Sequence, residues 1–213
     1  MAAAALLTKE QRTIVSDIGF SSILELSCSN VSCSLVHWLL DRFDPSTKTL
    51  KLENGFCFTI NAKCVKKILG IPDGPRKIKC KGTLESLMFM RERIASIGRT
   101  PSVEELFGMI NPELVEAPFA RVFMLLALSS FLCPSSRGVC SSRYYPALIN
   151  VCSIKDLDWC SFVLDWLATY VKKFKDSDRQ RMCSTSVGCA IILVVYFEPS
   201  NICKYICIYL HNF

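Results

Sequence analysis

Between Ser16 and Pro75, apolar residues recur first with a helical period and then with a period of two. The elements predicted from this stretch are the starting point for the fold of the whole chain. The first element is a helix, because its apolar residues recur at three- and four-residue spacing. These residues are Val36, Leu39, Leu40 and Phe43. We expect Asn30 to cap this helix and Asp44-Pro45 to end it, since proline disfavours a helical residue before it.

A β-hairpin is predicted over residues 49–60, where the period changes to two. Leu50 and Leu52 alternate with polar residues, and Phe56, Phe58 and Ile60 do the same after the dipeptide Asn54-Gly55. Asn-Gly between two alternating runs is the strongest short-range hairpin signal, because both residues of a two-residue turn need a positive φ. We therefore expect a two-residue turn with its apolar residues on one face.

A short amphipathic helix is predicted directly after the hairpin. Asn61 is its expected cap, Gly70 its expected left-handed end, and Pro72 follows. The apolar residues Val65, Ile68 and Leu69 point inward in this prediction, and the lysines Lys63, Lys66 and Lys67 point outward.

Further helices are predicted after Pro75. Thr83 begins one with Leu84, Leu87, Met88 and Ile94 on its inward face, and Ser102 with Glu105 forms a capping box for the next. The segment 122–132 is apolar nearly all round, so we expect it at the centre of a helical bundle.

Two more helices complete the prediction. Asp158 caps a long amphipathic helix that carries Trp159 and Trp166, and the segment 187–197 forms a last buried helix. The predicted fold class is therefore mainly α, with one small β-hairpin near the N-terminus. The predicted domain spans residues 15–197, between an N-terminal lead (1–14) and an atypical tail (198–213) that has the look of a truncated or read-through end.

No segment reaches the roughly 18–20 uninterrupted apolar residues that cross a bilayer. Residues 187–197 come near, but Glu198-Pro199-Ser200-Asn201 interrupts them. A hydropathy method that joins residues 187–210 will report a membrane helix, and we expect no membrane association.

The net charge of +6 is concentrated, because nine Lys or Arg residues and two acids lie between Lys48 and Lys81. One interpretation is a solvated surface, and the other is contact with nucleic acid or with an acidic partner. The residues predicted for such contact are Lys63, Lys66, Lys67, Arg76, Lys77, Lys79 and Lys81.

The 13 cysteines are an odd number, and most lie in apolar helical runs, where a free thiol behaves as a small hydrophobe. No cleavable secretory signal precedes them, so we expect unpaired thiols in a reducing compartment. Cys33 and His37, with Cys28 upstream, and Cys203, Cys207 and His211 have helical spacing, but neither set supplies the four ligands of a structural zinc site.

No nucleophile with a positioned base, Walker loop or dinucleotide fingerprint is present in the sequence. We therefore expect no enzyme activity, no cofactor and no metal.

Several framework segments resemble the plant mobile domain, a family often labelled aminotransferase-like and carried by plant transposons and by nuclear plant proteins derived from them. The segments are Asp17-Ile18-Gly19-Phe20, 35–45, 65–74, Phe131-Leu132-Cys133-Pro134, Tyr144-Tyr145, the Asp158-Trp159 helix and Gly188-Cys189. The resemblance covers residues 15–197. A pyridoxal-phosphate enzyme needs a Schiff-base lysine and a phosphate-binding cup, normally on a larger α/β fold. The sequence has lysines but shows neither such a cup nor an alternating βα pattern, so we treat the aminotransferase label as a name only.

The resemblance implies a transposon-derived or domesticated nuclear module that binds protein partners or associates with chromatin. Direct nucleic-acid binding through residues 48–81 is the alternative, and a remnant of a protein fused to a cysteine peptidase is a third. The nucleus is the expected location, with the cytoplasm as runner-up. The residues expected to hold the architecture are Phe20, Trp38, Phe43, Gly55, Leu69, Gly70, Trp159 and Trp166.

Overall fold

Helices make up most of the computed structural model, which describes residues 6–26, 32–52, 55–94, 100–134, 138–176 and 190–197. The helices are α2 (Lys9–Asp17), α3 (Ser21–Glu25), α4 (Cys33–Arg42), α5 (Ala62–Leu69), α6 (Leu84–Ile94), α7 (Val103–Met109), α8 (Glu116–Ala127), α9 (Tyr145–Leu148), α10 (Trp159–Asp176) and α11 (Ile191–Phe197). A π-helical turn, η1 (Leu128–Leu132), extends α8, and the 3-10 turns η2 (Ser142–Tyr144) and η3 (Val151–Asp156) flank α9. The predicted class, mainly helical with a little β-structure, is confirmed.

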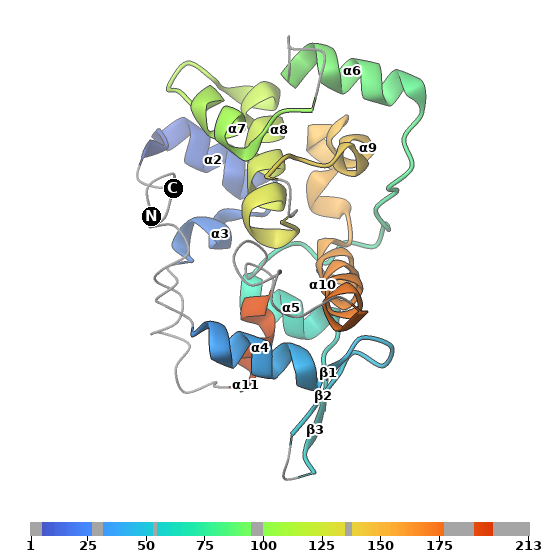
Figure 1. Ribbon diagram of the computed structural model, residues 1–213. Helices are drawn as coiled ribbons and strands as arrows, with labels where there is room; N and C mark the ends of the chain where they lie inside the picture. The colour runs from blue at the N-terminus through green and yellow to red at the C-terminus, as the bar shows by residue number, and fades with distance from the viewer. Residues whose placement is uncertain are drawn as a thin grey trace.

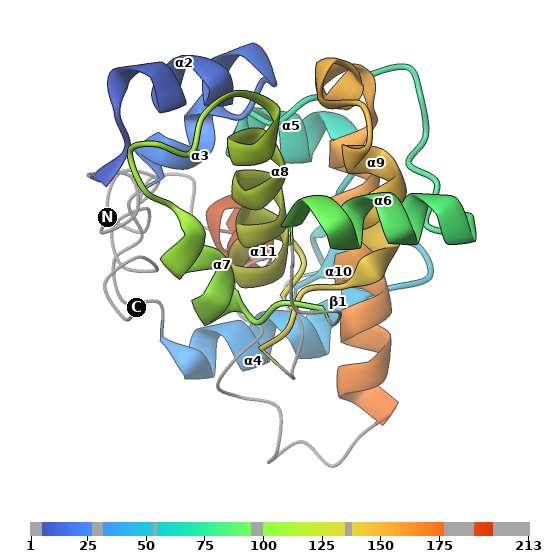
Figure 2. The same cartoon turned by 90° about the horizontal axis from the view of Figure 1, so that it is seen from above.

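The helix α8 lies at the centre of one end of the molecule. Figure 1 shows α2, α6, α7 and α9 around it, while α4, α5 and α11 form the other end, from which the strands project. Figure 2 shows α8 from above, between α2 and α7 on one side and α9 on the other. Every residue from Phe119 to Ala127 is buried, which confirms that this apolar segment is central.

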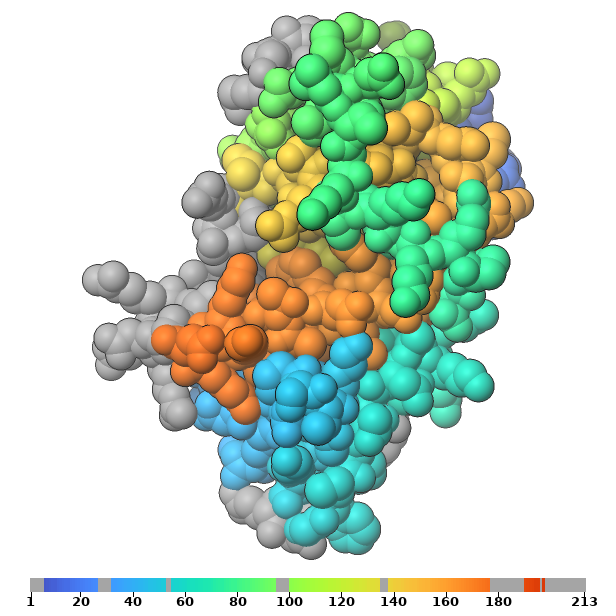
Figure 3. All heavy atoms as spheres, turned by 90° about the vertical axis from the view of Figure 1, so that its right-hand side faces the viewer, coloured from blue at the N-terminus to red at the C-terminus, as the bar shows by residue number. Residues whose placement is uncertain are grey.

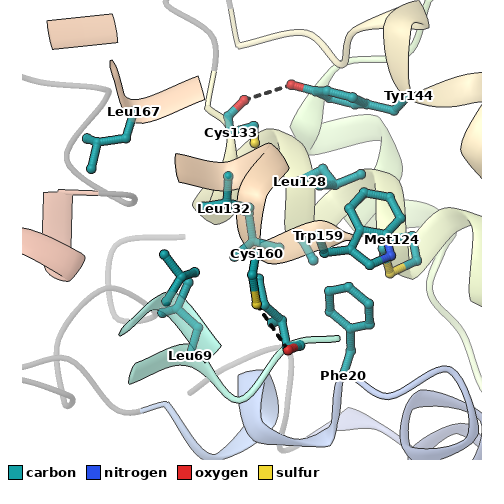
Figure 4. Packing of buried hydrophobic residues seen from close by; sticks show 14 of the residues in the cluster. Phe20, Leu69, Met124, Leu128, Leu132, Cys133, Tyr144, Trp159, Cys160 and Leu167 are labelled. Carbon is teal, nitrogen blue, oxygen red and sulfur yellow. Dashed lines mark hydrogen bonds between the residues drawn. The ribbon is translucent and has the colours of Figure 1, made fainter. Parts of the chain in front are cut away.

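The two ends meet at the start of α10. Trp159 is fully buried and packs edge to face against Phe20, with ring centroids 5.7 Å apart (Figure 4). Its Nε1 donates to the carbonyl of Ile154 at 2.8 Å. Next to it, the thiol of Cys160 donates to the carbonyl of Ile71 at 3.4 Å. These contacts join residues that are far apart in the sequence into one core.

The strands form an antiparallel sheet of three, in the order β1 (Phe43–Asp44), β2 (Thr49–Lys51) and β3 (Cys57–Thr59). The hairpin is confirmed, but the sequence pattern missed β1. The predicted two-residue turn is wrong, because Leu52 donates to Phe56 at 2.9 Å and Gly55 donates to Leu52 at 3.1 Å. These bonds leave three residues in the loop, and Gly55 with φ +82° takes the left-handed position of a three-residue hairpin.

The helix α5 begins and ends where the sequence predicts. The side chain of Asn61 accepts a hydrogen bond from the N–H of Cys64 at 3.1 Å, and Gly70 ends the helix with φ +63°. The side chain of Asp158 likewise caps α10 by accepting from the N–H of Ser161 at 2.8 Å. The capping box of Ser102 and Glu105 at the start of α7 is also confirmed.

Three predicted details differ from the structure. The helix α4 starts at Cys33 with Ser32 as its cap residue, and the predicted cap, Asn30, lies outside the described residues. The predicted inward face of α6 is wrong in part, because Leu84 and Met88 are exposed, whereas Ser86, Met90 and Ile94 are buried. The buried positions follow the i, i+4, i+8 row, so the face that meets α8 and α9 lies to one side of the apolar ridge.

The N-terminal residues belong to the same core. Leu7 and Val15 are buried, α2 packs on α8, and the predicted boundary between residues 14 and 15 falls inside α2. In the described part of the chain, no helix combines the length and the apolar character needed to cross a membrane. Of the range 187–210, the structure describes only 190–197.

Candidate partner-binding surface

Six lysines on neighbouring segments form an exposed basic surface, which we call the lysine strip. Its members are Lys63, Lys66 and Lys67 of α5, and Lys77, Lys79 and Lys81 of the connector to α6. The three helical lysines face outward because Val65 and Leu69 turn the opposite side of α5 into the core. All six side chains are exposed.

The connector is held in place at its beginning. The N–H of Gly74 donates to the carbonyl of Leu157 at 3.1 Å, and the guanidinium of Arg76 donates to a carboxylate oxygen of Asp156 at 3.1 Å. The N–H of Asp158 donates back to the carbonyl of Arg76 at 2.8 Å. Arg76 therefore fastens the connector to η3 and is not part of the strip, although the sequence grouped it with the lysines.

The other lysines near the strip have partners. Lys48 pairs with Asp165, and Lys51 pairs with Asp44 at 3.2 Å. The hydroxyl of Ser46 and the ammonium group of Lys51 hold the pKa of the Asp44 carboxyl well below its usual range. Across the described ranges, by contrast, no ion pair involves any of the six strip lysines.

The segments that carry the lysine strip lie along one face of the molecule (Figure 3). In Figure 3 the hairpin, α5 and the connector follow one another along this face up to α6. Large apolar side chains are exposed at both ends of the run: Phe56, 62% exposed, stands on the hairpin, and Leu84 and Met88, 72% and 53% exposed, lie on the first turns of α6. The surface therefore combines positive charge with apolar contacts.

The outer edge of β3 is a part of this surface that the sequence pattern did not reveal. Alternation placed Phe56 on the buried face of the hairpin, but this end of the hairpin projects beyond the body of the molecule (Figure 1), so its side chain stays exposed. Only the exposed polar residues on β3, Cys57 and Thr59, hint at an edge strand in the sequence.

The residues predicted to hold the architecture lie in different environments. Phe20, Phe43, Leu69 and Trp159 are buried. Trp38 is half-buried, lies under the guanidinium of Arg42 at 4.0 Å and contacts Phe197 of α11 with ring centroids 5.1 Å apart. Trp166, also half-buried, stacks on Tyr170 at 5.4 Å.

Buried polar residues were missed as well. Arg121, expected to flank the central helix, is 6% exposed and donates from Nε to the carbonyl of Leu148 at 3.1 Å and from the other end of its guanidinium to that of Ile149 at 3.0 Å. Burial, with a smaller contribution from the charge of Arg93, lowers the pKa of Arg121. It serves to close the carbonyl end of α9, which periodicity alone does not indicate.

The predicted cysteine and histidine sets do not form a metal site in the described part of the chain. His37 is half-buried, with its ring centroid 5.5 Å from that of Phe174, and Cys33 is exposed. No group of three or more His, Cys, Asp or Glu side chains is arranged to hold an ion among the residues described. Cys28, Cys203, Cys207 and His211 lie outside those residues.

The fold and the lysine strip define a mainly helical protein with a small three-stranded sheet and a basic, partly apolar surface. Residues 1–194 match the model of a family described as a domain of unknown function, DUF8566, so the protein belongs to this family. Searches of the curated proteins and of the solved structures find no match.

The predicted membership in the plant mobile domain family is wrong, because the family model that spans the chain is DUF8566. The resemblance was based on helix caps and core residues, such as Asp158-Trp159 and Phe20, and residues of this kind recur in unrelated helical proteins for the same structural reasons. The transposon origin depended on that resemblance alone and is withdrawn with it.

Proposed function

We propose that this protein is a non-enzymatic binding module whose lysine strip contacts an acidic segment of a protein partner. The observation that carries the proposal is the group of six exposed lysines that make no ion pair within the described residues. Neighbouring positive charges repel one another, and binding of an acidic partner relieves this repulsion. Complementary charge also raises the association rate constant.

The apolar residues at the ends of the strip favour a protein over a nucleic acid. Protein interfaces combine a desolvated apolar core with a charged rim, and Phe56, Leu84 and Met88 supply apolar area next to the lysines. Nucleic-acid surfaces are typically rich in arginines for bidentate contacts and in aromatic rings for stacking. Here Arg76 is already paired with Asp156.

Fluorescence anisotropy tests the proposal with two labelled probes, a peptide of alternating glutamate and valine and a 20-base-pair DNA duplex, each over a salt series. The variant Lys77→Glu/Lys79→Glu/Lys81→Glu changes only connector residues. The control variant Lys9→Glu/Lys172→Glu/Lys173→Glu makes the same change of net charge outside the strip. Circular dichroism and thermal melting check that both variants keep the fold.

We expect the strip variant to weaken peptide binding by about tenfold. Three exposed contacts of about 0.5 kcal/mol each give about 1.5 kcal/mol, which corresponds to this factor. The control should change Kd less than about twofold. Duplex binding with a steep salt dependence and no peptide binding would replace the proposal by a nucleic-acid module, and binding of neither probe would end it. A nuclear location stays a prediction, which imaging of a fluorescent fusion tests.

A further inference from the structure

The outer edge of β3 offers backbone groups that the rest of the sheet does not use. The bonds from Leu52 N–H to Phe56 and from Ile60 N–H to the carbonyl of Lys48, 2.9 and 2.8 Å long, fix the residues of β3 that face β2. Because these residues alternate, the N–H and C=O groups of Cys57 and Thr59 point away from β2. No partner for these groups is found within the described part of the chain.

The opposite edge of the sheet is closed. The outward N–H of Phe43 in β1 donates to Leu39 as the last bond of α4, and its outward carbonyl accepts from Nζ of Lys175 at 2.8 Å. Lysines and helices are common means of protecting an edge strand from further pairing. The sheet is therefore protected at β1, while β3 carries neither a lysine nor a proline.

We infer that β3 receives an extended segment of the acidic partner as a fourth strand, an inference that rests on the proposed function. The groups of Cys57 and Thr59 lie on one edge, two residues apart, a spacing of about 7 Å that an added strand matches. On the apolar face of the sheet, Phe56 is exposed and would be covered by alternate side chains of this strand.

Charge complementarity defines the occupant. The chain passes from β3 directly into α5, so Lys63 follows the free edge within four residues of Thr59. A strand that continues past Thr59 reaches the lysine strip. The segment that fits has apolar residues alternating with acidic residues. Its apolar residues would cover Phe56, and its acidic residues would meet the lysines of the strip.

The experiment uses the full chain and the peptide of alternating glutamate and valine. Thr59→Pro removes the outward N–H without removing a backbone bond of the existing hairpin, and proline is tolerated at such edge positions. Like Thr59→Ala, it also loses the bond between the hydroxyls of Thr49 and Thr59, which are 3.4 Å apart. Thr59→Ala is the matched control, since it loses the same side chain and keeps the N–H. We expect Thr59→Pro to weaken binding at least about tenfold and Thr59→Ala less than about twofold.

Amide hydrogen exchange of the unaltered protein gives a readout that does not depend on the folding of Thr59→Pro. The amides of Cys57 and Thr59 should exchange at least about tenfold more slowly with bound peptide, while Phe58, whose N–H already faces β2, should change little. One result would refute the added strand and leave the proposed function intact. In this result the connector variant weakens peptide binding, but bound peptide does not protect these amides, and Thr59→Pro and Thr59→Ala bind the peptide equally well. If the unaltered protein does not bind the peptide, both the added strand and the proposed function are refuted.

Discussion

Gly70 ends α5 in the left-handed conformation and lies against Ser22 of α3. Its φ is +63°, and a Cβ built on it would meet the hydroxyl of Ser22 and come within 2.6 Å of the Cβ of Ser22. Rotation of the Ser22 side chain moves the hydroxyl but not its Cβ. Gly70→Ala therefore adds a steric cost to the conformational one.

Gly55 is the matched control. It has a φ of +82° and no heavy atom within 4 Å of the position of an added Cβ, so Gly55→Ala has the conformational cost alone. A left-handed alanine costs about 1–2 kcal/mol, and the stiffer unfolded chain returns about 0.4–1 kcal/mol, which leaves about 1 kcal/mol. Overpacking against Ser22 adds about 1–3 kcal/mol, so Gly70→Ala should lower the free energy of unfolding by about 2–4 kcal/mol.

Urea unfolding followed by circular dichroism measures both variants. A double-mutant cycle with Ser22→Gly isolates the contact, and we expect a coupling energy of about 1–3 kcal/mol because this change removes the opposing Cβ. If Gly70→Ala and Gly55→Ala differ by less than about 0.5 kcal/mol, or if the cycle shows no coupling, the close approach of α3 and α5 is not what requires glycine here.

Two further predictions concern the core. Burial raises the pKa of Cys140 to about 11 and of Cys160 to about 12. Unfolded thiols lose their protons near pH 8.5, so the free energy of unfolding should fall as the pH rises from about 8.5 through the folded-state pKa values. Urea unfolding at pH 8 and pH 10 measures this fall, which should be smaller for the variant Cys140→Ala/Cys160→Ala. Trp159→Phe removes the bond to the carbonyl of Ile154 and leaves a void, so it should lower the free energy of unfolding by about 2–4 kcal/mol in the same assay. Trp166→Phe, at a half-buried position, should lower it by less than about 1 kcal/mol. Equal losses for the two changes would contradict the assigned role of Trp159.

Helix ends were predictable because their chemistry is local. Asn61, Gly70 and Asp158 act on backbone groups within three or four residues, so the sequence contains both partners of each cap. The lysine strip was visible for a similar reason, since its members are close together in the chain.

Features that depend on distant segments were not predictable. The strand β1 has only two residues, and pairing with β2 defines it more than any propensity of Phe43-Asp44. Leu84 and Met88 have apolar spacing, but the position of α8 and α9 decides which side of α6 is buried. Arg121 appears in the sequence as a boundary, and only the carbonyls of α9 explain why it is inside.

The packing of α4 and α5 on α10 and α11 has a consequence for synthesis of the chain. The segment from α4 to α5 has clear local signals, yet its apolar side is covered by helices that come much later in the sequence, as the contact of Trp38 with Phe197 shows. On the ribosome, this segment emerges long before the residues that cover it. Its hairpin and helices must therefore wait with apolar surface exposed, so folding depends on contacts of long sequence separation and should be slow for a helical protein of this size.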